Sequence, residues 1–317
     1  MRMRILLAAI TIPVALASPI LAQDWTTYRG DPQRSGNPGG KPGPSTPRVL
    51  WTFKAKEHFI AAPVPTSQGL LVSGLSFINS SVLYHLDTDP KAEKRVLWQK
   101  SSPLLELPTV SSPLVRDGEV IFGDGMHQTN GASLQALDLP AGSPRWQLRV
   151  DGTLVHLEGA PTLAQGRIYL GGGAAGVLCV DPNRLTLEGK EGSPAEMIKI
   201  LKQKWTDLQN DFEEKRKKKD PLALPPRDSD LPRPTPALVW NRGKNDWHVD
   251  APLAVVEGKV LVATAFLDKE MVGKRALICL DTATGKELWQ TALSVNPWGG
   301  PSVQGKTVVV TGSTIGY

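Results

Sequence analysis

The feature that most constrains how this chain can fold is a repeat of about 49 residues. Each copy opens with a small residue and a proline, followed by a short strand, a glycine turn and a β-rich strand, as in SSPLVRDGEVIFGD and DAPLAVVEGKVLVAT. The shared prolines are Pro63, Pro113, Pro161, Pro252 and Pro301. Their spacing is regular except between the third and the fourth, where roughly 42 residues are inserted.

A second marker follows the same period. In LICLDTATGKELW, residues 277–289, an apolar strand ends at Asp281, a turn passes through Gly285, and Trp289 follows. The order of Asp, turn and Trp recurs upstream. The residues assigned to this structural repeat are Asp87, Trp98, Asp138, Gly142, Trp146, Asp181, Trp240, Asp281, Gly285 and Trp289. Two markers that share one period indicate a repeated unit of structure.

Each unit contains short stretches of alternating or continuously apolar residues, which are typical of strands buried on one or both faces. A four-stranded unit of roughly 40–50 residues is the signature of a propeller blade. We therefore predict an all-β fold, a β-propeller of four-stranded blades. Repeats are expected near 61–103, 111–150, 159–248 and 250–291, with a partial unit at 299–317. An apolar stretch around Trp51 reads as the outer strand of one further blade.

In such a fold the repeated residues have structural roles. We expect the Asp carboxylate to accept hydrogen bonds from the backbone of the turn, and glycine to supply the positive φ that the turn requires. The indole ring is expected to pack against the next blade. Because the pattern recurs from unit to unit, we interpret it as architecture and not as a catalytic or sugar-binding site.

The segment LICLDTATGKELW resembles the tryptophan-docking repeat of the quinoprotein-type (pyrroloquinoline quinone-like, PQQ-like) β-propellers, A-x-D-x-x-T-G-x-x-x-W. Asp281, Thr284, Gly285 and Trp289 match that pattern, and Cys279 replaces the alanine. The stretch DWTTYRGDPQRSGNPG, residues 24–39, resembles the start of secreted bacterial members. Propellers of this family usually have seven or eight blades, so the units found here predict an incomplete ring.

The resemblance implies two kinds of function. The resemblance to quinoprotein dehydrogenases implies a pair of adjacent cysteines, acidic and amide calcium ligands, and an Asp that acts as a base. In this chain Cys179 and Cys279 are far apart in the sequence, and no matching calcium motif is found. The chain is also similar to the propeller lipoprotein of the outer-membrane barrel-assembly machinery, a scaffold. We therefore expect a non-catalytic scaffold that binds a protein or another ligand, with no catalytic residue, metal or cofactor assigned. The alternatives are a PQQ- and calcium-dependent alcohol or sugar dehydrogenase whose catalytic part is missing from this chain, and a carbohydrate-binding module.

The N-terminus, MRMRILLAAITIPVALASPILAQDW, has two arginines, a short apolar run and small residues, which predicts a signal peptide at 1–22. No second stretch of membrane-spanning length follows. We expect an exported protein, periplasmic or extracellular, with a protein partner in the cell envelope. The formal charge of +5 is spread over a mixed surface and gives no reason to expect nucleic-acid binding.

Residues 184–236 interrupt the third repeat. Ser193, Pro194 and Glu196 predict a helix start, and an apolar stripe follows at helical spacing. The stripe consists of Met197, Leu201, Trp205, Leu208 and Phe212, and it is expected to pack on the propeller, with a partner surface as the alternative. The run KRKKK then reads as a solvated helix end.

The remaining motifs carry little chemistry. The G-x-G-x-x-G run at Gly171, Gly173 and Gly176 precedes a strand, which predicts a tight loop and not a dinucleotide site. The histidines form no HExxH or His-x-His pair, so no metal ligand is assigned. His127 and the pair Trp247–His248 fall in expected loops and are the candidates to line a site. The two cysteines are expected to be buried free thiols.

Overall fold

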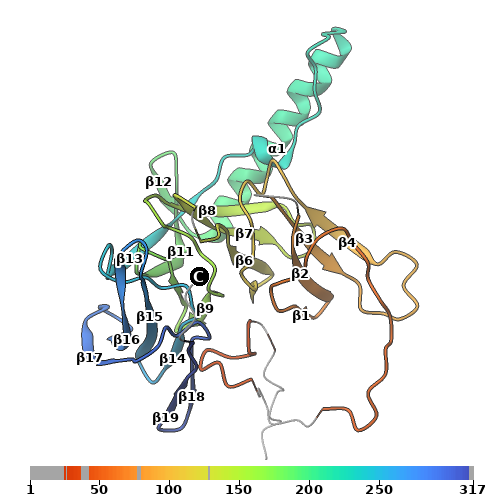
Figure 1. The fold of residues 1–317 in the computed structure, drawn as a ribbon. Helices are drawn as coiled ribbons and strands as arrows, with labels where there is room; N and C mark the ends of the chain where they lie inside the picture. Colours follow the sequence, from red (N-terminus) through yellow and green to blue (C-terminus); the bar gives the residue numbers. More distant parts are fainter. Residues whose placement is uncertain (1–24, 26, 37–42, 77–79, 128, 314–317) are drawn as a thin grey trace, which may run out of the picture.

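The computed structural model describes residue 25 and residues 27–36, 43–76, 80–127 and 129–313. The expected signal peptide at 1–22 lies outside these residues. The strands form sheets that follow one another in chain order around an arc, with the N-terminal segment on its open side (Figure 1). This arrangement confirms the predicted all-β propeller.

Neighbouring strands within each sheet are antiparallel. The first blade contains β1 (Val64–Thr66), β2 (Gly69–Leu75), β3 (Ser81–Leu86) and β4 (Val96–Lys100). The second contains β5 (Leu114–Arg116), β6 (Glu119–Gly123), β7 (Ala132–Asp138) and β8 (Pro144–Val150). The third contains β9 (Thr162–Ala164), β10 (Arg167–Gly171), β11 (Val177–Leu187) and β13 (Thr235–Arg242), with β12 (Lys190–Gly192) paired to the end of β11. The fourth contains β14 (Ala254–Val256), β15 (Lys259–Leu267), β16 (Val272–Asp281) and β17 (Glu287–Ala292), and the hairpin of β18 (Pro301–Gln304) and β19 (Thr307–Val310) follows.

The core lies between successive blades. One apolar cluster joins Leu83 and Trp98 of the first blade to Phe122 and Leu137 of the second. Equivalent clusters join the second blade to the third and the third to the fourth. The third strand of a blade is therefore covered on both faces, which explains why β3 and β7 are buried along almost their whole length and are mostly apolar.

The repeated tryptophans occupy matching positions in their blades. Trp98 pairs with His85, Trp146 with Ala136, Trp240 with Cys179, and Trp289 with Cys279. Each partner lies two residues before the repeated Asp, and the register shifts directly after it. A bulge at this point bends the outer strand and re-aims its side chains. The indoles are thus carried by equivalent backbone in all four blades.

The indole rings dock on the turn of the next blade. The Trp98 N–H donates to the backbone oxygen of Leu139 at 2.7 Å, and the Trp240 N–H donates to that of Thr282 at 3.1 Å. Both acceptors directly follow the repeated Asp. Gly285 in this turn has a φ of 68°, and a Cβ atom there would lie 2.7 Å from Cδ2 of Trp240. Glycine is therefore required both by the backbone conformation and by the ring that packs on it.

The repeated carboxylates organise the same turns. In each blade the Asp side chain accepts a hydrogen bond from a backbone N–H two or three residues further on: Asp89 to Asp87 at 2.8 Å, Ala141 to Asp138 at 3.0 Å, Asn183 to Asp181 at 3.0 Å, and Thr284 to Asp281 at 2.8 Å. Such Asx-type turns fix the backbone oxygen that receives the indole.

Two tryptophans differ from the expected arrangement. The residues around Trp51 form no strand, so the outer strand predicted there is wrong. An outer strand needs a third strand of its own blade beside it, and no described strand pairs with this segment. The Trp51 N–H nevertheless donates to the backbone oxygen of Thr88 at 3.2 Å, so the indole docks on the first blade. Trp289 remains 42% exposed, because the described strands of the following unit, β18 and β19, offer no Asp turn for it.

The insertion begins later than predicted, because both neighbouring strands extend into it. Thr186 near the end of β11 pairs with Thr235 at the start of β13. The predicted helix is confirmed as α1 (Pro194–Lys217), which Ser193 and Glu196 start with a capping box. A 3₁₀ turn, η2 (Asp228–Asp230), lies on the return.

Only the first turns of α1 pack on the propeller. Met197 and Leu201 are buried, and Met197 joins the cluster around Trp146. Trp205, Leu208 and Phe212 are only partly buried, so the prediction that the whole stripe packs on the propeller is wrong. The distal half of α1 projects away from the blades with the return segment beside it (Figure 1). No helix in the described part of the chain has the length and apolar character needed to cross a membrane.

The N-terminal segment 27–36 ties the inner strands together. The backbone oxygens of Pro32 and Gln33 accept from Val255 in β14 and Val303 in β18. The guanidinium of Arg34 is fully buried and donates to the backbone oxygens of Leu253 at 3.0 Å, Ala160 at 2.9 Å and Pro161 at 3.0 Å. Burial lowers the pKa of Arg34 to about 9, which still leaves it charged at neutral pH.

Candidate functional site

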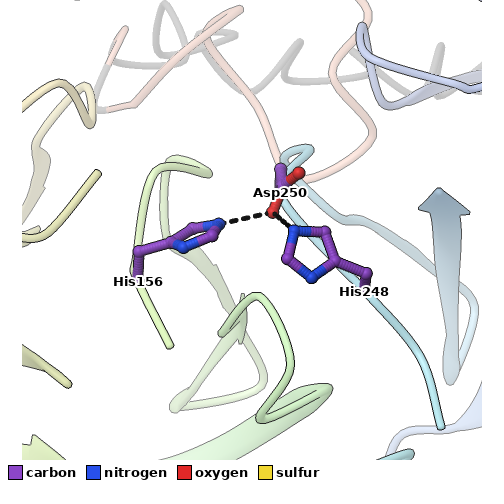
Figure 2. Close-up of side chains that lie close together, drawn as sticks. All are labelled: His156, His248 and Asp250. Carbon is purple, nitrogen blue, oxygen red and sulfur yellow. Dashed lines mark hydrogen bonds and ion pairs between the residues drawn. The ribbon is translucent and has the colours of Figure 1, made fainter. Parts of the chain in front are cut away.

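The structure distributes the repeated Asp, Gly and Trp residues over the outer strands and turns of separate blades. It does not bring them together in one place. It gathers a different set of side chains, of which the sequence pointed only to His248: His156, His248 and Asp250 (Figure 2). Both imidazole Nε2 atoms converge on Oδ1 of Asp250, at 2.7 Å from His156 and 3.0 Å from His248.

The cluster forms where three connections between strands meet. His156 lies between β8 and β9, and His248 and Asp250 lie between β13 and β14. The loop between β10 and β11 joins the two segments through backbone hydrogen bonds. Gly173 exchanges two of them with Val249, at 3.0 and 3.1 Å, and Ala174 donates to Leu154 at 3.0 Å. The two imidazoles are thereby held on either side of one loop.

Gly173 allows His156 to approach this loop. Its φ is +56°, and a Cβ atom at this position would lie 3.0 Å from both Cε1 and Nε2 of His156. The strand β11 begins at Val177, directly after the glycine-rich run. The run therefore forms the tight loop that was predicted from the sequence, and its function is to let a ring pack closely.

The electrostatics of the cluster are those of a buried ion pair. Burial by itself would raise the pKa of Asp250, but hydrogen bonds from both imidazoles outweigh it and hold that pKa well below its usual range. Burial lowers the pKa of His156, and its hydrogen bond to Asp250 more than reverses this, so the net shift is upward. The His156 and His248 side chains are each 1% exposed, and that of Asp250 is 7% exposed.

Three buried polar atoms of the cluster have no hydrogen-bond partner among the described residues. They are Nδ1 of His156, Nδ1 of His248 and Oδ2 of Asp250. Buried polar atoms are nearly always paired in folded proteins, and exceptions often mark a bound ion or a functional site. The contrast with Arg34, whose donors all meet acceptors, is direct.

Both imidazoles line a cavity of about 370 Å³. Leu154, Phe266 and Trp298 also line it. Phe266 lies near the end of β15, and the other residues come from the connections β8–β9, β13–β14 and β17–β18; these connections and β15–β16 open at one end of the antiparallel sheets. We call this end of the propeller, together with the connections β6–β7 and β10–β11, the mouth.

A second cavity of about 750 Å³ lies beside the mouth, among the second blade, the connection between β4 and β5, and the return of the insertion. Asp124, Gln135, Arg149 and Arg233 are among its polar residues, and Arg233 comes from the return of the insertion. Burial raises the pKa of Asp124 to about 6, although hydrogen bonds from Ser133 and Gln135 oppose the shift. None of its described lining residues is Trp, Tyr or Phe, the side chains on which sugar rings usually stack.

The residues that the sequence placed in loops as candidates to line a site lie in different surroundings. His248 joins the cluster, whereas the neighbouring Trp247 is buried in the core between the third and fourth blades. His127 lies at the edge of both cavities beside Glu158, with Nδ1 3.7 Å from a carboxylate oxygen. His85 is packed in the first blade, with Nε2 3.2 Å from Thr66 Oγ1.

One sequence signal could have identified the cluster. The position two residues before the repeated proline is occupied by Ala61, Ser111, Gly159, Asp250 and Gly299. Four of these are small, and only Asp250 is charged. This exception, together with the H-x-D spacing to His248, marked a position at which the chain departs from its own repeat.

The donor set does not fit a calcium-held quinone. Ca²⁺ is bound by six to eight oxygen atoms, whereas two of the three groups here are imidazoles. Cys179 and Cys279 are free and buried in β11 and β16 of different blades, so they do not form the adjacent pair that the resemblance implied. Imidazole and carboxylate together suit a divalent transition metal.

Comparison with solved structures gives relatives of the same fold. The europium-containing methanol dehydrogenase matches with a TM-score of 0.52 at 14% identity, over 88% of this chain and 51% of that one. BamB from Moraxella catarrhalis matches with a TM-score of 0.46 at 13% identity, over 80% of this chain and 55% of that one. The chain thus spans about half the length of each of these proteins, and at 14% identity the likeness to the methanol dehydrogenase shows only the fold. Comparison with curated protein sequences gave no match.

Comparison with protein families is more informative. The family model described as outer membrane protein assembly factor BamB matches residues 43–198 and 229–315, on both sides of the projecting helix. The matched residues include all four blades, and the unmatched stretch 199–228 is most of the insertion. The chain therefore belongs to this BamB-like family of PQQ-type β-propellers.

Proposed function

We propose that this chain is exported to the cell envelope and acts there as a non-catalytic scaffold that binds a protein partner through the mouth of the propeller. Membership of the BamB-like family carries this proposal, because the matching model describes an outer-membrane assembly factor and covers the blades. The N-terminal sequence, with its arginines, apolar run and small residues, supports export.

The distribution of side chains favours the mouth as the binding face. The outer rim repeats the same residues, and these are occupied in holding one blade to the next. The mouth presents residues that occur once, among them Phe266 and Trp298 around the smaller cavity. Recognition of one partner requires residues that differ from blade to blade. Aromatic side chains beside a pocket are typical of binding hot spots.

The proposal is tested by chemical crosslinking of the full chain in its native cells, followed by affinity purification and mass spectrometry. We expect a specific envelope protein that is recovered from the periplasmic or membrane fraction and lost when Phe266 and Trp298 are both changed to Ala. Recovery of the chain from the cytoplasm, or of no partner above a tagged control, would contradict it. A matched control is Leu222→Ala, which changes an 83% exposed apolar residue far from the mouth.

The competing dehydrogenase function has a direct assay. The purified full-length protein is incubated with the quinone and Ca²⁺, and alcohol oxidation is followed with an artificial electron acceptor. We expect no activity, since two of the three groups in the buried cluster are imidazoles, which Ca²⁺ does not prefer. Saturable oxidation of an alcohol or sugar would overturn the non-catalytic assignment.

A further inference from the structure

We propose that His156, His248 and Asp250 form a binding site for a divalent transition metal of the zinc type, with an open coordination position toward the smaller cavity. The site would hold one ion per chain. It goes beyond the scaffold role and does not depend on it.

The donor atoms already converge. One ring nitrogen of His156, one ring nitrogen of His248 and a carboxylate oxygen of Asp250 lie within 4.8 Å of one another. A tetrahedral zinc ion with bonds of about 2.0–2.1 Å places its ligand atoms about 3.3 Å apart. The present nitrogen–oxygen distances are 2.7 and 3.0 Å, so side-chain movements of roughly half an ångström would admit the ion.

The unpartnered atoms provide the second, independent observation. Oδ2 of Asp250 is buried without a partner, and Oδ1 receives both imidazoles. An ion between the three side chains would use this free carboxylate capacity. On metal binding both imidazoles would present a deprotonated Nε2 to the ion and keep one proton on Nδ1, and the second proton of an imidazolium would be released to solvent, so that the ligands would be neutral imidazoles and an ionised carboxylate.

The backbone holds these ligands before any ion arrives. The loop between β10 and β11 is hydrogen-bonded to Val249, between His248 and Asp250, and to Leu154, two residues before His156. The ligands come from two blade-to-blade connections, so an ion would join the second, third and fourth blades at the mouth. Both imidazoles line the cavity of about 370 Å³, whereas Asp250 does not, so the fourth position faces the cavity.

The affinity should be moderate. Histidine ligands in strong sites donate their second ring N–H to an acceptor, and loss of such a partner costs about 10- to 100-fold in affinity. Neither Nδ1 atom has such an acceptor among the described residues. We therefore expect the Zn²⁺ affinity to be at least about 10- to 100-fold lower than that of closed structural zinc sites. Ca²⁺ and Mg²⁺ should not compete, since both prefer oxygen ligands.

The test is titration of the metal-free full chain with Zn²⁺ by isothermal calorimetry, and with Co²⁺ by visible absorption. We expect one saturable site per chain, visible bands of tetrahedral Co²⁺, and Zn²⁺ affinity at least about 100-fold lower in His156→Gln, His248→Gln and Asp250→Asn. His58→Gln removes an exposed histidine elsewhere and should bind like the parent.

Absence of saturable binding to the parent, or unchanged binding in the His156→Gln/His248→Gln double variant, would overturn the proposal. Circular dichroism checks that each variant is folded. If a variant fails to fold, NMR of the parent remains decisive: Zn²⁺ must shift two imidazole spin systems and leave that of His58 in place. A shift of His58 alone would mean that the ion binds only adventitiously.

Discussion

The outer rim and the mouth of this propeller use side chains in opposite ways. At the rim the same contact recurs: Trp98 and Trp240 each donate an indole N–H to the backbone oxygen after the repeated Asp of the next blade. At the mouth, His156, His248 and Asp250 form an arrangement found once in the described structure, and three of their polar atoms lack partners. The buried N–H of Trp146 has no partner among the described residues, so an unsatisfied atom alone does not mark function. Recurrence from blade to blade marks architecture, whereas a polar cluster that occurs once and gathers three unsatisfied atoms marks a candidate for function.

The largest effect is expected from the most deeply docked indole. Trp146 is fully buried between the second and third blades, where Met197 of the insertion also covers it. Trp146→Ala should lower the free energy of unfolding by about 3–5 kcal/mol, through lost burial and the cavity left behind. Urea denaturation followed by circular dichroism measures this, and a loss below about 1 kcal/mol would mean that the rim does not hold the blades together.

A single-copy residue with satisfied contacts should behave like the rim. Arg34→Met keeps the volume but leaves the buried oxygens of Leu253, Ala160 and Pro161 without their donor. We expect a loss of about 3 kcal/mol in the same denaturation assay. Arg29→Met, which loses a contact to Ser302, is the matched control and should cost less than about 1 kcal/mol. Equal effects of the two changes would remove the distinction between them.

The polar cavity beside the mouth predicts a pH dependence. Burial raises the pKa of Asp124 to about 6 in the folded protein, so the protonated carboxyl is favoured by folding. Its contribution to stability is fully present below the unfolded pKa of about 3.9 and is lost as the pH rises through about 6. The difference in unfolding free energy between the parent and Asp124→Asn should therefore fall by on the order of 2 kcal/mol from pH 4 to pH 7. A difference that stays constant or grows with pH would show that Asp124 is not held in its protonated form.

The smallest effect is expected at the exposed end of the rim. Trp289 has the same backbone position as Trp146 but is 42% exposed, and every residue of β17 is exposed. Trp289→Ala should change the unfolding free energy by less than about 1 kcal/mol. A loss comparable to that of Trp146→Ala would mean that Trp289 is buried in solution, for example by association of chains, which sedimentation would detect.

The sequence predicted the rim far better than the mouth, for a physical reason. Blade packing imposes the same constraint on every unit, so Asp281, Gly285 and Trp289 could be recognised by comparison within the chain. The prediction of an outer strand failed at Trp51, because the indole docks on the first blade without a strand around it. The packing prediction also failed for the distal part of the apolar stripe of α1, because helical periodicity shows which residues share a face of the helix but not which surface packs against that face. The cluster at the mouth joins residues 94 positions apart, His156 and Asp250, through a loop that only the folded structure brings between them.

The central claim is that the mouth is the functional face and that the rim is architecture. Site-specific photocrosslinking in living cells tests it most directly, with the photoreactive residue placed at Phe266 in the mouth or at Leu288, 49% exposed, on the rim strand β17. We expect a discrete adduct with an envelope protein from position 266 and none from position 288. Adducts from position 288 alone would contradict it.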